Sequence, residues 1–182
     1  GVQETSEYIE KMVEYANQNH INSCLKHFPG YGNNEDTHTG VAVDERSYET
    51  FTSSDYLPFQ AGIEEGVPSI LVSHNVIVSI DKDYPASLSK EVINELRNKL
   101  GFTGIIMTDD LAMDAVKSYV EDGRAATLAI NAGNDMIITS DFMGMKNEVI
   151  QSVEDGTISE ETLNTAVTRI IAWKYYSGLY EK

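Results

Sequence analysis

The chain has 182 residues, of which 41% are hydrophobic, and this is enough to bury the core of one domain covering residues 1–182. Its 29 acidic and 13 basic residues give a formal net charge of −16, which repels phosphate backbones and anionic lipids. We therefore expect no nucleic-acid partner. No apolar run approaches the roughly 20 residues of a membrane-spanning helix, so we also expect no membrane insertion.

Apolar residues recur at helical spacing near the start of the chain, and the pattern then changes to a short apolar run. The same change occurs four times. The predicted helices, in chain order, are 8–16, 54–66, 92–100, 125–132, 145–153 and a last one from about Ser159. The predicted strands, each following one of the first four helices, are 21–25, 69–72, 104–107 and 135–138.

Cap and stop residues set the predicted boundaries. Ser54 is a candidate N-cap, and glycines follow several helices as C-terminal stops. Cys24 lies in an apolar run, and we expect a small buried side chain rather than a reactive thiol or a metal ligand. The last helix carries an apolar stripe that we expect to be buried, formed by Leu163, Ala166, Val167, Ile170 and Ile171.

Alternating apolar strands and amphipathic helices predict an α/β fold with a parallel sheet and right-handed crossovers. The chain reads as four parallel βα units preceded by a helix and ending in two helices. Two architectures fit this order. One is an open doubly wound sheet, and the other is half of a (β/α)₈ TIM barrel. A complete barrel of this kind typically has about 250 residues and eight strands.

Polar residues follow the predicted strands, at the edge where both architectures place their sites. The candidates are Lys26 and His27 after the first strand, His74 after the second, and Asp109 with Asp110 after the third. Each has a structural alternative: either aspartate fits the N-cap of a short helix, and each histidine fits a core position. Convergence on one edge favours a functional site. Lys26 also fits a Schiff-base nucleophile, which would make the protein an aldolase.

The long loop at residues 30–46 carries the triplet Asp36-Thr37-His38. An aspartate two residues before a histidine can accept its ring N–H and prepare the imidazole for proton transfer. A solvated turn is the alternative. The sequence has no recognisable metal-ligand spacing and no glycine-rich phosphate loop, so we expect no metal or organic cofactor.

Two motifs resemble family 3 glycoside hydrolases of the β-N-acetylhexosaminidase (β-N-acetylglucosaminidase) branch. One is Lys-His-Phe-Pro-Gly-Tyr-Gly at 26–32 followed by Asp-Thr-His at 36–38, and the other is Pro-Ala-Ser-Leu-Ser at 85–89 leading to Met-Thr-Asp-Asp-Leu-Ala-Met at 107–113. The resemblance implies the second half of a TIM-barrel catalytic domain. It implies the following roles: Asp109 as nucleophile, His38 as acid/base assisted by Asp36, and Lys26, His27 and His74 as sugar-binding residues.

The resemblance further implies a retaining hydrolase that removes terminal β-linked N-acetylglucosamine from cell-wall or chitin-like glycans. The family's first four strands, which supply further sugar-binding residues, have no counterpart in this chain. We therefore expect weak or absent hydrolysis by the isolated chain, and a homodimer that completes the barrel. The alternative is a non-catalytic half-barrel that acts as a sugar-binding or assembly module.

Overall fold

The computed structural model describes residues 1–32, 42–120 and 123–179. Within these ranges the structure is an α/β fold whose main sheet has three parallel strands in the order β1-β3-β5. The strands are β1 (Cys24–Phe28), β3 (Ser69–Val72) and β5 (Ile105–Thr108). A second parallel pair, not predicted from the sequence, joins β2 (Val43–Asp44) to β4 (Val76–Ile77).

The helices follow the predicted order, with some boundaries moved. They are α1 (Val2–Gln18), α2 (Tyr48–Thr50), α3 (Tyr56–Glu64), α4 (Lys90–Asn94), α5 (Asp114–Lys117), α6 (Ala125–Ala132), α7 (Phe142–Glu154) and α8 (Glu160–Tyr176). The shorter helical segments are the π-helical η1 (Phe51–Asp55) and η3 (Glu95–Lys99), and the 3₁₀ turn η2 (Ala86–Leu88).

The second helix begins earlier than predicted. Ser54 lies inside η1, and the true N-cap is Ser47, whose Oγ accepts the Thr50 N–H at 3.3 Å. The α2, η1 and α3 segments follow one another without a break, so Ser54 has no free helix end to cap. The predictions for α6 and α8 are confirmed, because Gly133 follows α6 with φ of 111° and the Ser159 side chain caps α8.

The predicted fourth strand is present only as an irregular segment beside β5. A single parallel bridge joins Met107 to Met136 among the described residues. Two amides at this edge bond to side chains instead of main-chain carbonyls: the Ile106 N–H donates to Asp135 Oδ2 and the Ile138 N–H donates to Thr108 Oγ1. These side-chain bonds replace ladder bonds, so the segment runs parallel to β5 without becoming a regular strand.

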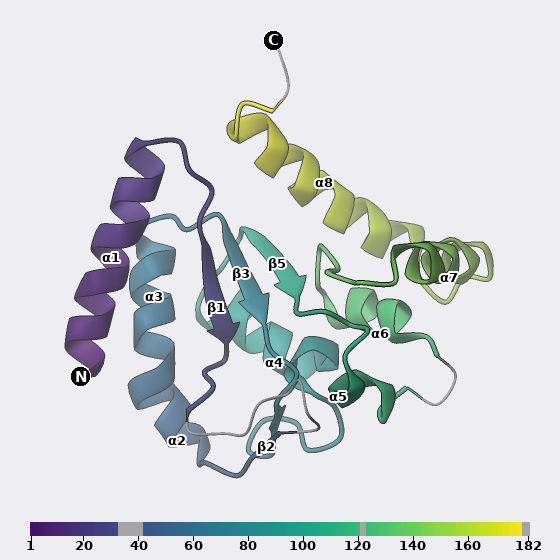
Figure 1. Cartoon of the computed structure of the whole chain (residues 1–182), viewed down its shortest axis with the longest axis horizontal. Coiled ribbons are helices and arrows are strands. Elements are labelled where there is room, and N and C mark those ends of the chain that lie inside the picture. The colour runs from purple at the N-terminus through teal and green to yellow at the C-terminus, as the bar shows by residue number, and fades with distance from the viewer. Residues whose placement is uncertain (33–41, 121–122, 180–182) are drawn as a thin grey trace.

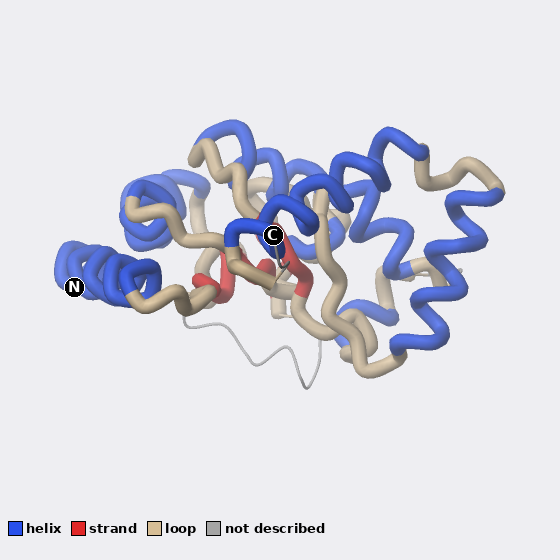
Figure 2. Tube along the Cα trace, turned by 90° about the horizontal axis from the view of Figure 1, so that it is seen from above, coloured by secondary structure: helices blue, strands red, loops and turns tan. Residues whose placement is uncertain are grey.

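Figure 1 looks onto one face of the sheet, with β1, β3 and β5 in view and α4 behind them, while Figure 2 shows the same layers from above. The covered face packs Leu25, Phe28, Ile70 and Ile106 into the main core with residues of α3 and α4. Cys24 alternates with Leu25 along β1 and is exposed, so the prediction of a buried thiol was wrong.

The stripe on α8 is also less buried than predicted. Ala166 is buried, but Val167 and Ile171 are exposed. Three large side chains of α1 are exposed as well, namely Tyr8, Met12 and Tyr15. Helices α1 and α8 therefore each present apolar side chains to the outside. Among the described residues, no helix has the length and apolar character needed to cross a membrane.

Candidate active site

The carboxyl ends of β1, β3 and β5 meet at one edge of the sheet. Main-chain bonds continue just past the strands, because the Ser73 N–H donates to the Phe28 carbonyl at 2.9 Å and the Asp109 N–H donates to the Val72 carbonyl at 3.0 Å. The residues that follow each strand are consequently held side by side. This arrangement brings together the three strand ends on which the sequence analysis placed its candidate residues.

Asp109 and His27 come together at this edge. Oδ2 of Asp109 lies 3.8 Å from Nε2 of His27, and the two side chains are 23% and 31% exposed. The other carboxylate oxygen, Oδ1, accepts the N–H of Asp110 at 2.9 Å. Asp109 therefore has one oxygen bonded to the main chain, while its carboxylate stays partly open and close to a histidine.

Asp110, the neighbouring carboxylate, has a different environment. Its Oδ1 accepts the N–H groups of Ala112 at 2.9 Å and Ser140 at 3.0 Å. Burial opposes ionisation, but these bonds outweigh it and lower the pKa of Asp110 below its ordinary value. Helix α5 has Met113 at its N-cap, so neither aspartate caps it. Asp110 thus ties two segments of main chain together, whereas the side chain of Asp109 remains available.

Lys26 lines a cavity of about 290 Å³ next to β1. His27, Gly30 and Tyr31 also line this cavity, and Pro58 and Phe59 of α3 form part of its opposite wall. The rings of His27 and Tyr31 meet edge to face, with centroids 5.4 Å apart. Lys26 and His27 therefore both border space large enough for a small polar group, and His27 reaches Asp109 as well.

His74 is fully buried, in contrast to its expected role as a sugar-binding residue. Its Nδ1 lies 2.7 Å from Ser87 Oγ and its Nε2 lies 3.0 Å from the main-chain oxygen of Asp110. Both ring nitrogens are thus bonded within the protein. The side chain contacts the segment that carries Asp109 but does not open onto the edge.

Arg46 is a site residue that the sequence analysis did not single out. Its guanidinium contacts both carboxylate oxygens of the buried Asp44, donates to Asp55 Oδ1 at 2.9 Å and reaches the Gly30 carbonyl at 3.3 Å. The bonds to Asp44 raise the pKa of Arg46 above its ordinary value. The local signal, an aspartate two residues before an arginine, is too common to have identified this cluster.

The Arg46 cluster also fits tightly around the turn that follows β1. A methyl group at Gly30 would lie 2.8 Å from Cβ of Asp55, and one at Gly32 would lie 2.7 Å from Cζ of Arg46. Both glycines have positive φ, at 127° and 55°. The two glycines of the 26–32 motif are therefore required both for the backbone conformation and for the close approach of Arg46 and Asp55.

The model of the family described as "Glycosyl hydrolase family 3 N terminal domain" matches residues 1–173 of the chain. This chain belongs to glycosyl hydrolase family 3. It is 35% identical over 130 residues to a beta-hexosaminidase of Nitrosomonas eutropha, covering 71% of this chain and 37% of that protein. It is 31% identical over 192 residues to a beta-N-acetylglucosaminidase/beta-glucosidase of Cellulomonas fimi, covering 96% of this chain and 33% of that protein.

The fold of this family 3 chain is similar to a solved structure of a glycoside hydrolase family 3 beta-N-acetylglucosaminidase from Paenibacillus sp.. The two superpose with a TM-score of 0.88 at 28% sequence identity, over 95% of this chain and 34% of that one. The family 3 chain thus spans less than half the length of each relative named above.

Two predicted residues of the family 3 chain, Asp36 and His38, lie outside the described residues. Among the residues that the structure does describe, no group of three histidine, cysteine, aspartate or glutamate side chains is arranged to hold a metal ion. The candidate site of the family 3 chain, as far as it is described, therefore comprises Asp109, His27 and Lys26, with His74, Asp110 and Arg46 as further candidates.

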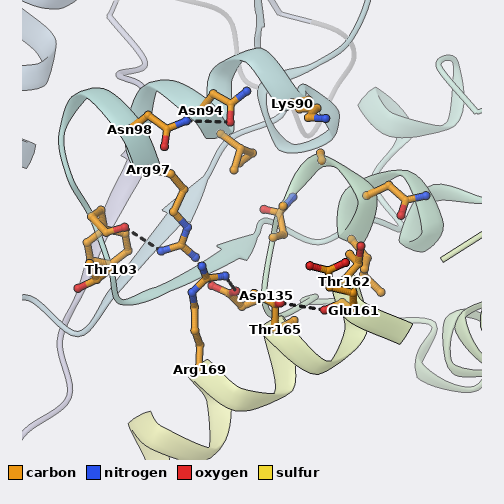
Figure 3. A pocket seen from close by; sticks show the side chains of 18 residues that line it. Lys90, Asn94, Arg97, Asn98, Thr103, Asp135, Glu161, Thr162, Thr165 and Arg169 are labelled. Carbon is orange, nitrogen blue, oxygen red and sulfur yellow. Dashed lines mark hydrogen bonds and ion pairs between the residues drawn. The ribbon is translucent and has the colours of Figure 1, made fainter. Parts of the chain in front are cut away.

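A larger cavity of about 660 Å³ lies at the opposite end of β5, between η3 and α8 (Figure 3). Arg97 and Arg169 point toward Asp135 from these two elements, and Asp135 is almost fully buried. Arg97 also donates to the carbonyls of Phe102 and Gly104. Because all these groups bond to one another or to main chain just before β5, we interpret the cluster as structural in this family 3 chain.

Proposed function

We propose that this chain is the second half of the barrel of a retaining β-N-acetylhexosaminidase, with Asp109 as the nucleophile. The observation that carries the proposal is the difference between the two neighbouring aspartates. Asp110 is occupied by two main-chain amides, whereas Asp109 is partly open and lies 3.8 Å from His27. A carboxylate at the carboxyl end of a parallel strand has the position that catalytic residues take in barrel enzymes.

A retaining hydrolase needs one group that attacks the anomeric carbon and a second that acts first as acid and then as base. In this proposal Asp109 forms the bond to the sugar while His38 gives its proton to the departing oxygen. His38 then takes a proton from water, and the hydroxide equivalent releases the sugar from Asp109. Asp36 accepts the other ring N–H of His38 and favours its protonated form.

The proposed substrate is terminal β-linked N-acetylglucosamine on cell-wall or chitin-like glycans. The relatives named beta-hexosaminidase and beta-N-acetylglucosaminidase support this substrate class. Lys26 and His27 are the proposed contacts to sugar hydroxyls, and their place beside the 290 Å³ cavity supports that role. Side-chain N–H groups held in fixed positions can donate hydrogen bonds to sugar hydroxyls. The proposed reaction uses no metal or organic cofactor.

The four βα units are proposed to form half of an eight-stranded barrel, and the order of the three parallel strands with their intervening helices supports this arrangement. A second copy of the chain would complete the barrel as a homodimer. Apolar side chains exposed on α1 and α8 support such an association. The same exposure favours the second candidate function, a non-catalytic half-barrel that serves as a sugar-binding or assembly module.

One experiment separates the two candidate functions. The chain, as part of an assembly that completes the barrel, is incubated with a fluorinated N-acetylglucosaminyl fluoride, which forms the covalent intermediate and releases it slowly. Its peptides are then analysed by mass spectrometry. We expect the sugar on the peptide containing Asp109, and Asp109→Asn as the matched control removes the label. Binding of N-acetylglucosamine without any label on Asp109 would favour the non-catalytic module.

A further inference from the structure

The contacts of His74 determine which ring nitrogen carries the proton. A carbonyl oxygen can only accept a hydrogen bond, so Nε2, at 3.0 Å from the Asp110 oxygen, is the protonated nitrogen. Burial lowers the pKa of His74, which keeps the ring neutral. Nδ1 therefore accepts the hydroxyl proton of Ser87, at 2.7 Å. The Asp110 carbonyl thus selects the Nε2–H form of the ring, and the Ser87 hydroxyl bonds to the remaining nitrogen.

Ser87 is itself fixed in the 85–89 segment. Its N–H donates to the Ser73 carbonyl at 3.0 Å, and its carbonyl accepts Nδ2 of Asn134 at 2.8 Å. Ser87 and His74 are both fully buried. The hydroxyl that bonds to Nδ1 is therefore held in place by main chain just after β3 and by a side chain that precedes the segment beside β5.

The bond from His74 acts on the main chain next to Asp109. The Asp110 carbonyl accepts both His74 Nε2 and the Met113 N–H, at 3.0 and 3.1 Å. The Asp110 side chain is held by two further amides, and its own N–H is bonded to Oδ1 of Asp109. Since Asp110 is fixed at its amide, side chain and carbonyl, any rotation of its backbone would also turn the Asp109 carboxylate.

We propose that His74, bonded at Nδ1 to Ser87, is a positioning residue that holds the Asp109 carboxylate in its reactive direction through the Asp110 main chain. The inference rests on the proposed role of Asp109 as nucleophile. It assigns His74 no contact with sugar. The charged or titratable groups that act on the ring are Asp109, Asp110 and His27.

Two substitutions separate the contacts of the ring. In His74→Gln the amide nitrogen can occupy the place of Nε2 and still donate to Asp110, whereas in His74→Asn it can reach only the place of Nδ1, near Ser87. In an active assembly that completes the barrel, with a nitrophenyl N-acetyl-β-glucosaminide as substrate, we expect His74→Asn to lower kcat by about tenfold or more at nearly unchanged KM. His74→Gln should retain most of the rate. A role in filling space or satisfying Ser87 predicts the opposite order, and that order would overturn the proposal.

Nitrogen NMR of the ring tests the same idea without turnover. We expect a protonated Nε2 and an unprotonated Nδ1 at neutral pH, and amide signals of residues 109–111 that shift in His74→Asn but not in His74→Gln. If His74→Asn does not fold, Ser87→Ala replaces it. Nδ1 then loses its donor, so the amide signals of residues 109–111 should shift while Nε2 stays protonated. A charged ring, the Nδ1–H form or unmoved amides would exclude the positioning role. If these signals behave as expected but an assembly in which the wild-type chain is part of a complete barrel does not hydrolyse the glycoside, only the proposed function fails.

Discussion

Nε2 of His27 lies 3.8 Å from Oδ2 of Asp109, although 82 positions (109 − 27) separate the two residues in the sequence. The parallel pairing of β1 with β3 and of β3 with β5 produces this proximity, because it aligns the carboxyl ends of the three strands. A histidine at this distance can orient a carboxylate or bind a sugar hydroxyl next to it. The first prediction concerns this carboxylate.

Asp109→Ala is expected to affect mainly the catalytic rate, and Asp110→Ala mainly the stability of the fold. In an active assembly, Asp109→Ala should lower kcat/KM for an aryl N-acetyl-β-glucosaminide by about a thousandfold or more, because the covalent step has no other nucleophile. Asp110→Ala should lower the rate much less and destabilise the fold by about 1 kcal/mol, since it leaves the Ala112 and Ser140 amides without their acceptor. Kinetics and urea unfolding of both variants check this. A larger rate loss at Asp110 would contradict the assignment of the nucleophile.

His38→Ala tests the proposed general acid. Proton donation matters most when the leaving group is a poor one, so the variant should lose far more activity on alkyl glycosides than on nitrophenyl glycosides. The measurement is kcat/KM over a series of leaving groups of increasing pKa. Asp36→Asn should show the same trend with a smaller slope. A loss that is uniform across the series would assign a binding role to His38.

Gly30→Ala tests the fit of the Arg46 cluster. The new methyl group would lie 2.8 Å from Cβ of Asp55, on a backbone with φ of 127°. We expect a loss of about 1 to 3 kcal/mol in the free energy of unfolding from the backbone strain, with a further loss from the clash. Gly101→Ala is the matched control, because φ is +70° there and no atom lies within 4 Å of the added group. Equal losses in the two variants would show that Asp55 does not restrict the turn.

The burial of His74 predicts a pH dependence of stability. Its pKa is lowered from 6.5, so below about pH 6.5 the unfolded chain takes up a proton that the folded chain does not. The unfolded state then binds more protons, and the free energy of unfolding decreases as the pH falls through this window. Urea unfolding from pH 8 to pH 5 measures the slope. His74→Gln should flatten it, and an unchanged slope would assign the effect to other groups.

Light scattering tests the proposed homodimer. A single chain has a mass of 20.2 kDa, so a dimer at micromolar concentration should scatter as about twice that mass. Ile171→Lys on α8 and Tyr8→Lys on α1 place charges among the exposed apolar side chains and should shift the equilibrium toward monomer. Glu7→Lys on α1 is a control for the change of charge. A monomeric wild type would exclude the dimer, and rapid hydrolysis by the pure chain would contradict the expectation of weak or absent activity.

The sequence by itself determined the features that depend on neighbours along the chain. The alternation of apolar runs and helical stripes predicted the parallel α/β order, and Gly133 and Ser159 marked the ends of α6 and α8 correctly. It also placed Asp109 directly after its strand, whereas Lys26 and His27, predicted to follow the first strand, lie inside β1. The correct predictions succeeded because hydrophobic periodicity and helix capping act over only a few residues.

Only the tertiary structure decided how side chains from distant segments pair. It buried His74 between Ser87 and Asp110, joined Arg46 to Gly30 and Asp55, and used the Asp135 carboxylate where a ladder bond was expected. It also left Cys24 exposed and moved the helix start from Ser54 to Ser47. Each of these outcomes depends on hydrogen bonds or packing across elements, and local residue patterns carry no information about which distant donor meets which acceptor.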